Sequence, residues 1–236
     1  MSPFLGEFIG TMLLIILGDG VVANVVLNKT KGNNSGWIVI SFGWAMAVFL
    51  GVFASTSLGG GGHLNPAVTI AMAAFNTDFD SSLLPAYIGA QFAGAITGAI
   101  IVWLAYKQHF DATDDKDGKL AVFCTGPAIR NPGFNILTEI IGTFVLVLGA
   151  LAMSKPASSL GTLDALPVAL LVLGIGLSLG GPTGYAINPA RDLGPRIAHF
   201  ILPMRNKRDS DWGYSWIPVA GPIIGALIAA YLFKLI

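Results

Sequence analysis

The stretch Gly184-Tyr-Ala-Ile-Asn-Pro-Ala-Arg-Asp192 contains a tripeptide, Asn-Pro-Ala, that also stands at residues 65–67, within His63-Leu-Asn-Pro-Ala-Val-Thr69. Asn is a preferred N-cap residue, and Pro is favoured at the first helical position because its missing N–H is not needed there. Each copy therefore predicts the start of a helix. Both copies lie in apolar parts of the chain, so both helices are expected to begin inside a hydrophobic region.

A helix that begins at membrane depth leaves backbone N–H groups unpaired and directs a partial positive charge inward. Lipid cannot satisfy these groups, so they must face protein or a water-filled cavity. Two such helix starts that met head to head would form a polar, electropositive waist through a bilayer. The duplicated motif therefore indicates a channel.

The composition favours an integral membrane protein. Of the 236 residues, 54% are hydrophobic and 11% are charged, and the formal net charge is zero. Soluble domains contain about 25% charged residues, and the lack of net positive charge disfavours a nucleic-acid partner. The single cysteine, Cys124, excludes an intrachain disulfide and a thiolate metal cluster, and we expect no cofactor or metal. The first apolar run, from Pro3, lacks the basic start of a cleavable signal and reads as a permanent span.

The hydropathy pattern predicts an all-α protein with six spans, because about 20 apolar residues cross about 30 Å of hydrocarbon. The expected spans are residues 4–27, 37–56, 84–106, 134–153, 165–179 and 214–235. The apolar stretches 66–75 and 189–200 are too short to cross, so we expect two re-entrant half-helices. Each follows a glycine-rich approach that is poorly suited to a helix interior.

The chain contains an inverted repeat. Glu139-Ile-Ile-Gly-Thr143 repeats Glu7-Phe-Ile-Gly-Thr11 with an offset of 132, and the Asn-Pro-Ala copies are offset by 123. Each half holds three spans and one half-helix, and an odd number of spans forces the halves to run in opposite directions. We expect a first repeat at 1–106, a connecting loop at 107–132 and a second repeat at 133–236. The acidic residues of the loop predict a solvated segment at the membrane surface.

The two motifs and their contexts resemble those of the major intrinsic protein (aquaporin) family over nearly the whole chain. Asp192, Arg196 and the pair Pro218-Val219 are similar to the glycerol-facilitator branch. The resemblance implies a homotetramer with one pore per subunit, in the plasma membrane, with passive flow of glycerol, similar small neutral solutes and water. It also implies cytoplasmic termini, although the basic residues Lys29, Lys31 and 205–208 would then lie outside, against the positive-inside tendency.

The resemblance also implies a narrow selectivity filter made of Trp44, Gly176, Tyr185 and Arg191. A permanent charge such as Arg191 in an apolar segment is by default functional, and its planar fork matches vicinal hydroxyls. Gly176 leaves space where water-selective members place a histidine. The run from Trp44 to Asn65 is one residue longer than the usual pattern, so the role of Trp44 depends on the register, and a plain core aromatic is the alternative.

The central constriction is expected at Asn65 and Asn188, whose amides would donate to a passing oxygen. The positive helix ends beside them would oppose cations and hydronium. The family's ladder of pore-lining carbonyls falls on Gly61, Gly62, His63, Gly184, Tyr185 and Ala186.

Two alternatives to a glycerol facilitator stay open on the sequence alone. A water-selective channel is opposed by Gly176, Asp192 and Pro218. A proton-coupled transporter is suggested by the intramembrane carboxylates Glu7 and Glu139, although their symmetric placement favours structural acceptors for the loops.

His63 is either a pH-sensitive pore residue or a packed histidine. No nucleophile stands with a base, so we do not expect an enzyme. The sequence does not determine gating or the relative rates for glycerol, water, urea, dihydroxyacetone, peroxide and lactic acid.

Overall fold

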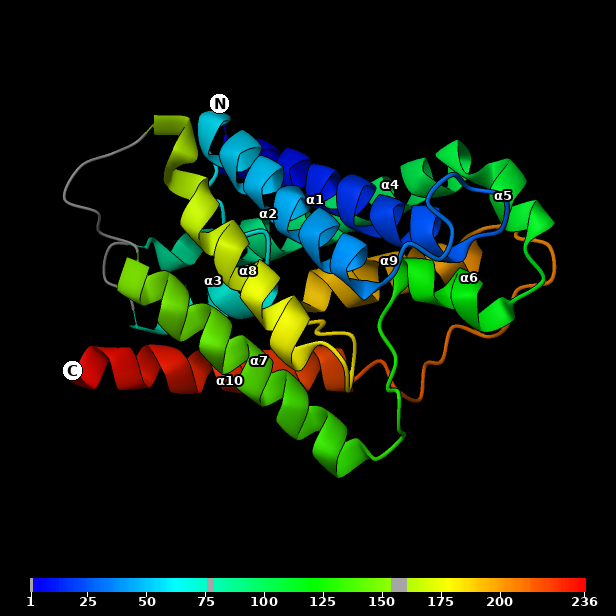
Figure 1. Cartoon of the computed structure of the whole chain (residues 1–236). Helices are drawn as coiled ribbons and strands as arrows, with labels where there is room; N and C mark the ends of the chain where they lie inside the picture. Colours follow the sequence, from blue (N-terminus) through cyan, green and yellow to red (C-terminus); the bar gives the residue numbers. More distant parts are fainter. Residues whose placement is uncertain (1, 76–78, 154–160) are drawn as a thin grey trace.

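The computed structural model describes residues 2–75, 79–153 and 161–236, and this part of the chain is helical without strands (Figure 1). Two groups of four helices succeed each other, as the repeat predicts. The first group comprises α1 (Pro3–Val26), α2 (Trp37–Ser57), α3 (Pro66–Phe75) and α4 (Leu84–Ala105), with a short 3₁₀ turn at Ser81–Leu83. The second comprises α7 (Pro132–Met153), α8 (Leu166–Leu179), α9 (Pro189–Ile201) and α10 (Ile217–Leu235).

Five of these helices, α1, α2, α4, α7 and α10, are long and apolar enough to cross a membrane. The predicted span 165–179 matches α8, which has 14 residues and is short for an α-helix that crosses a membrane. A 3₁₀ helix of 5 residues, Gly161–Ala165, precedes it directly. At about 1.5 Å per α residue and about 2 Å per 3₁₀ residue, the two together extend about 31 Å, close to the hydrocarbon thickness.

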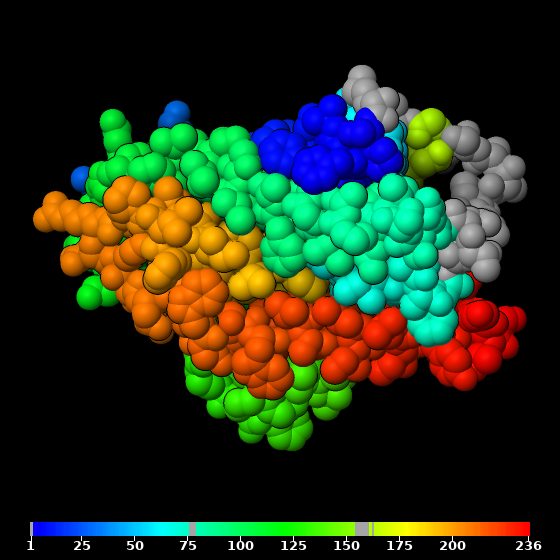
Figure 2. Space-filling view, turned by 180° about the vertical axis from the view of Figure 1, so that it is seen from behind, coloured from blue at the N-terminus to red at the C-terminus, as the bar shows by residue number. Residues whose placement is uncertain are grey.

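Each half-helix packs against a long helix of the opposite repeat. The half-helix α3 lies against α10, and α9 lies against α4. Figure 2 shows α9 between α4 and α10 on one face of the molecule. Both half-helices are therefore enclosed by protein, as their unpaired starts require.

Glycines allow the longest helices to touch within each repeat. A Cβ on Gly94 of α4 would collide with the carbonyl oxygen of Phe8 in α1, and a Cβ on Gly225 of α10 would collide with that of Ile140 in α7. Phe8 and Ile140 are separated by the repeat offset of 132. The same close backbone contact is thus made twice, as small residues at helix crossings permit.

Substitution Gly225→Ala is expected to lower stability by about 1–3 kcal/mol, the usual result of overpacking. The added methyl would meet backbone atoms of Ile140 and the Phe144 nitrogen at 3.0 Å, and backbone cannot move aside as a flexible side chain can. Thermal unfolding in detergent measures the effect. Gly89→Ala is the control, because a Cβ there meets no atom within 4 Å. Equal melting temperatures for the two variants would contradict the tight crossing.

The segment 107–132 differs from the expected solvated loop. It forms two helices, α5 (Lys107–Ala112) and α6 (Lys116–Phe123), and α6 packs against α1 and α9. The charged side chains of this segment are largely exposed, but Phe110 and Phe123 are buried with ring centroids 5.5 Å apart. The connection between the repeats thus contains two short helices, which the charges of the segment do not indicate because its apolar face depends on Phe110 and Phe123.

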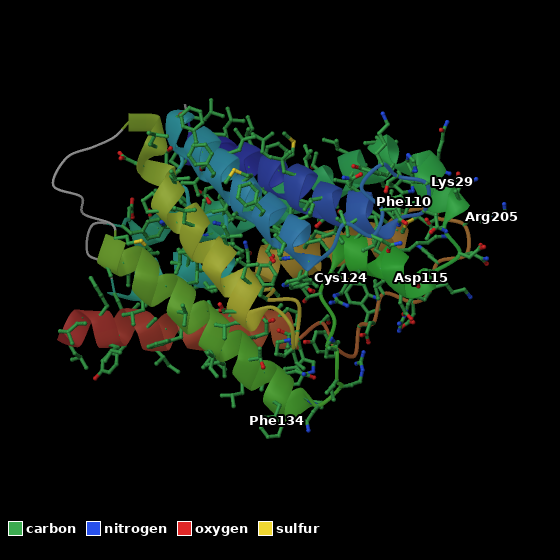
Figure 3. The ribbon with its side chains drawn as sticks, viewed as in Figure 1. Lys29, Phe110, Asp115, Cys124, Phe134 and Arg205 are labelled. Carbon is green, nitrogen blue, oxygen red and sulfur yellow. The ribbon has the colours of Figure 1, made fainter. Side chains whose placement is uncertain are left out.

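The two termini lie at one end of the molecule, and α5 and α6 lie at the other (Figure 1). Lys29, Asp115 and Arg205 gather at the α5 and α6 end, whereas Phe134 lies apart from them at the start of α7 (Figure 3). The charged connections of the two repeats therefore share one end.

Candidate functional site

The loops before the two half-helices have matching backbone conformations. Leu64 and Ile187, which directly precede the two asparagines, have φ of 51° and 44°. Two residues earlier, Gly62 and Tyr185 have φ of 69° and 40°. Left-handed backbone costs a non-glycine residue about 1–3 kcal/mol and persists where tertiary contacts hold it.

Two buried carboxylates hold these loops. Glu7 accepts from the backbone N–H groups of His63 at 3.0 Å and Leu64 at 2.8 Å. Glu139 accepts from the equivalent groups of Ala186 at 3.0 Å and Ile187 at 2.8 Å. Both side chains are at most 1% exposed. The carboxylates therefore satisfy backbone donors that would otherwise be unpaired at membrane depth.

Three further polar side chains complete these contacts, and the sequence motifs did not predict their role. Ser55 donates to Glu7 at 2.9 Å, and Thr183 donates to Glu139 at 2.7 Å. Gln91 donates to Glu7 at 2.8 Å and to the Thr69 hydroxyl at 2.9 Å. The available signal was Gln91 itself, an amide inside the apolar run of α4.

The two asparagines join the repeats at their centre. Asn65 Nδ2 donates to the Ile187 carbonyl at 2.8 Å, and Asn188 Nδ2 donates to the Leu64 carbonyl at 2.8 Å. Their Oδ1 atoms accept from the first turns of the half-helices, at Ala67 and Ala190. An amide nitrogen carries two hydrogens, so each Nδ2 retains one further donor.

A cavity of about 160 Å³ passes these asparagines. One wall is polar and the other is apolar. The polar wall holds residues of both loops and Arg191, and the apolar wall comes mainly from α2, α7 and α8. The predicted site residues among its lining are Trp44, Gly62, His63, Asn65, Tyr185, Ala186, Asn188 and Arg191. The apolar side includes Val48, Val52, Leu146, Val168 and Val172.

Arg191 and Trp44 meet in this cavity. The guanidinium carbon lies 3.9 Å from the Trp44 ring centroid, which is a close cation–π contact. Arg191 is 7% exposed, and its Nη1 has no hydrogen-bond partner among the described residues. The guanidinium therefore retains donor capacity beside an aromatic face. The contact brings Trp44 to Arg191 despite the longer run to Asn65, and the place of Trp44 in a selectivity filter stays a prediction.

Three predicted residues lie beside the cavity lining. Gly176 faces the Tyr185 ring, since its Cβ would lie 2.9 Å from Tyr185 Cζ. Gly61 lies against the Tyr87 hydroxyl, and Gly184 lies against Thr125. The pore-lining role of the Gly61 and Gly184 carbonyls stays a prediction.

A buried ion pair supports α9 behind the cavity. Arg196 and Asp192 lie 2.8 Å apart, and both side chains are 0% exposed. Asp192 also accepts from the Thr125 N–H at 2.8 Å and hydroxyl at 2.6 Å. Arg196 Nη1 donates to the Ser210 carbonyl at 2.7 Å. The pair therefore fixes α9 to both connecting loops, a role that the resemblance of these two residues to the glycerol-facilitator branch did not predict.

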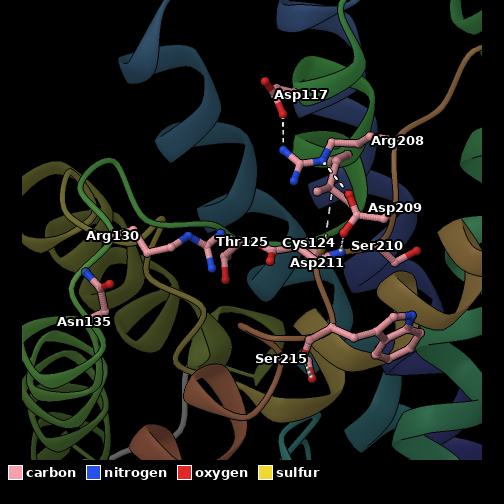
Figure 4. Close-up of polar contacts among 12 residues, drawn as sticks. Asp117, Cys124, Thr125, Arg130, Asn135, Arg208, Asp209, Ser210, Asp211 and Ser215 are labelled. Carbon is pink, nitrogen blue, oxygen red and sulfur yellow. Dashed lines mark hydrogen bonds and ion pairs between the residues drawn. The ribbon is translucent and has the colours of Figure 1, made fainter.

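The loop after α9 contacts both α6 and the C-terminal end of α9. Arg208 bonds Asp117 of α6 and lies 3.3 Å from Asp209 (Figure 4). Lys207 donates to the carbonyls of His199, Phe200 and Leu202 at the end of α9, and partial burial lowers its pKa from the usual value. A cation at a helix C-terminus complements the helix dipole.

One buried acidic residue was not predicted to be important, and no hydrogen bond to its carboxyl group is found among the described residues. Asp19 of α1 is 0% exposed, and neither of its oxygens has a hydrogen-bond partner within the described part of the chain. The sequence signal was visible, since Asp19 is an acidic residue inside the first apolar span.

These features define a helical membrane protein with an inverted repeat and a cavity at the junction of two half-helices. The family model described as major intrinsic protein matches residues 1–233. The chain is 60% identical over 234 residues to a probable glycerol uptake facilitator protein of Thermotoga maritima, covering 99% of each chain. It is 55% identical to a glycerol uptake facilitator protein of Streptococcus pneumoniae, covering 100% of this chain and 99% of that one.

A solved structure, the aquaglyceroporin from Plasmodium falciparum, superimposes with a TM-score of 0.86 at 30% identity, and covers 98% of this chain and 94% of that one. The chain belongs to the major intrinsic protein family. The expected family and the aquaporin-like fold are thereby confirmed, and the protein is a membrane channel and not an enzyme.

Proposed function

We propose that this protein is a passive channel for glycerol and similar small uncharged solutes, and for water. The observation that carries the proposal is the two-sided cavity. A polyol has hydroxyls on one edge and C–H groups on the other. Arg191 and the loops offer donors and acceptors on one wall, and valine and leucine side chains offer an apolar surface on the other. The names of the relatives, which are glycerol uptake facilitators, support this substrate.

In this proposal, Trp44, Gly176, Tyr185 and Arg191 form the selectivity filter. Asn65 and Asn188 form the central constriction, where the positive ends of α3 and α9 exclude cations and protons. Glu7 and Glu139 act as structural acceptors, because their oxygens already bond loop N–H groups. We place both termini in the cytoplasm and α5 and α6 outside, with four subunits and one pore in each.

Stopped-flow light scattering on proteoliposomes tests the function. Glycerol uptake should run down its own gradient, faster than in protein-free vesicles, with an unchanged rate when a protonophore collapses an imposed pH gradient. Passive flow through a polar lumen needs no coupled proton. Fast water flow without glycerol uptake would instead identify a water-selective channel. Glycerol accumulation driven by the pH gradient would identify a transporter.

A further inference from the structure

Tyr185 stands where the first repeat has glycine. Its equivalent, Gly62, takes left-handed backbone without steric cost, whereas Tyr185 has φ of 40° with a large side chain. Strained non-glycine backbone clusters at functional sites, where the surrounding structure holds it. A strained backbone that carries a large side chain at this position indicates that the Tyr185 ring has a functional role. That role depends on the position in which its neighbours hold the ring.

Two glycines of the α8 end form a slot for this ring. A Cβ on Gly180 would lie 2.5 Å from Tyr185 Cδ1, 2.6 Å from the Gly176 carbonyl oxygen and 2.7 Å from Trp37 Cζ2. A Cβ on Gly176 would lie 3.0 Å from the Tyr185 hydroxyl. The ring thus occupies the space that two side chains would otherwise fill. Tyr185 is 5% exposed, so it cannot move outward freely.

Trp37 closes the slot from α2. Its indole Nε1–H donates to the Gly176 carbonyl at 2.9 Å. Its ring meets the Tyr185 ring edge to face, with centroids 5.9 Å apart and an interplanar angle of 78°. Edge-to-face aromatic pairs have a preferred geometry, so the contact orients as well as fills. A single side chain therefore fixes both the α8 backbone and the Tyr185 ring, although Trp37 does not line the cavity.

We propose that Trp37 and Gly180 are positioning residues that hold the Tyr185 ring and thereby set the size of solute that the filter admits. The inference rests on the proposed place of Tyr185 in the filter. A side chain at position 180 displaces the ring toward the lumen. Loss of the indole donor releases both the ring and the Gly176 carbonyl.

The test measures glycerol and water permeation in proteoliposomes for Gly180→Ala and Trp37→Phe, each in two backgrounds, the natural chain and Tyr185→Ala. Overpacking of this kind corresponds to at least about a fivefold effect, so in the natural background we expect Gly180→Ala to lower the glycerol-to-water ratio about fivefold or more. Trp37→Phe, which keeps a ring but loses the N–H, should change the same ratio about twofold or more. In the Tyr185→Ala background both effects should be clearly smaller, because the ring that transmits them is gone and only the contacts with the Gly176 carbonyl remain.

Gly181→Ala is the matched control, because a Cβ at the next residue meets no atom within 4 Å. Its ratio should equal that of the natural chain. The proposal is overturned if the Gly180→Ala effect is the same in both backgrounds, or if water and glycerol fall together, since either result indicates general damage to α8. Failure of the natural chain to pass glycerol would count against the proposed function instead.

Discussion

Gly176→His is expected to abolish most glycerol permeation while water continues to pass. A Cβ at this position already lies 2.9 Å from Tyr185 Cζ and 3.2 Å from the Ser41 hydroxyl, and an imidazole extends further into the same space. An added barrier of about 1–3 kcal/mol for a solute that must pass the imidazole corresponds to a roughly 5- to 150-fold slower passage. Water is smaller than glycerol, so its permeation should fall about threefold at most. Stopped-flow measurement of both solutes on the same vesicles gives the ratio.

Gly174→His provides the matched control for this experiment. It places the same side chain on α8 two residues earlier, where a Cβ meets no atom within 4 Å. Its glycerol rate should match that of the natural chain. If the histidines at 174 and 176 reduced glycerol equally, or if Gly176→His left the rate unchanged, Gly176 would not belong to the filter.

Arg196→Met is expected to cause the largest loss of stability. Its guanidinium donates to both oxygens of Asp192 and to the Thr125 carbonyl at 2.9 Å, in a fully buried place. Removal of one partner leaves an uncompensated carboxylate, which typically costs about 3–5 kcal/mol. For a chain of this size, that loss corresponds to a decrease of about 6–20 °C in the apparent Tm. Thermal unfolding in detergent measures it.

The exposed pair at the same end of the molecule gives the comparison. Arg208 bonds Asp117, with 34% and 78% of the two side chains exposed. Exposed ion pairs contribute about 0–1 kcal/mol, so Arg208→Met should lower Tm by a few degrees at most, about 2–4 °C per kcal/mol. Similar Tm values for the two variants would show that the buried pair does not anchor α9.

Much of this architecture was predictable because its signals are local. Asn-Pro fixes a helix start through capping chemistry, and α3 and α9 begin at Pro66 and Pro189, as predicted. Span boundaries follow hydropathy and differ from the structure by three residues or fewer. The matched sequences at Glu7 and Glu139 predicted equivalent roles, and both carboxylates bond their loops in the same way.

The features that escaped prediction depend on contacts between distant segments. The spacing of Asp192 and Arg196 shows a possible pair on one helix. Nothing local shows that Thr125, 67 residues earlier, completes it. In α5 and α6, the many charged residues indicate a solvated segment. The apolar face of α6 can be recognised as a packing surface only when α1 and α9 lie beside it. The same holds for Trp37, whose partner Gly176 is 139 residues away.

The reciprocal bonds of Asn65 and Asn188 have a consequence for biosynthesis. The acceptor for Asn65 is the Ile187 carbonyl, 122 residues later in the chain. At about 5–20 residues per second, the ribosome needs about 6–25 s to make that interval. Throughout this time the side chain of Asn65, at the start of the first half-helix, lacks the carbonyl to which it donates in the folded protein. The reciprocal bonds at the centre of the channel therefore form late, when both halves of the chain are present. An arrested chain that ends before Ile187 would lack them.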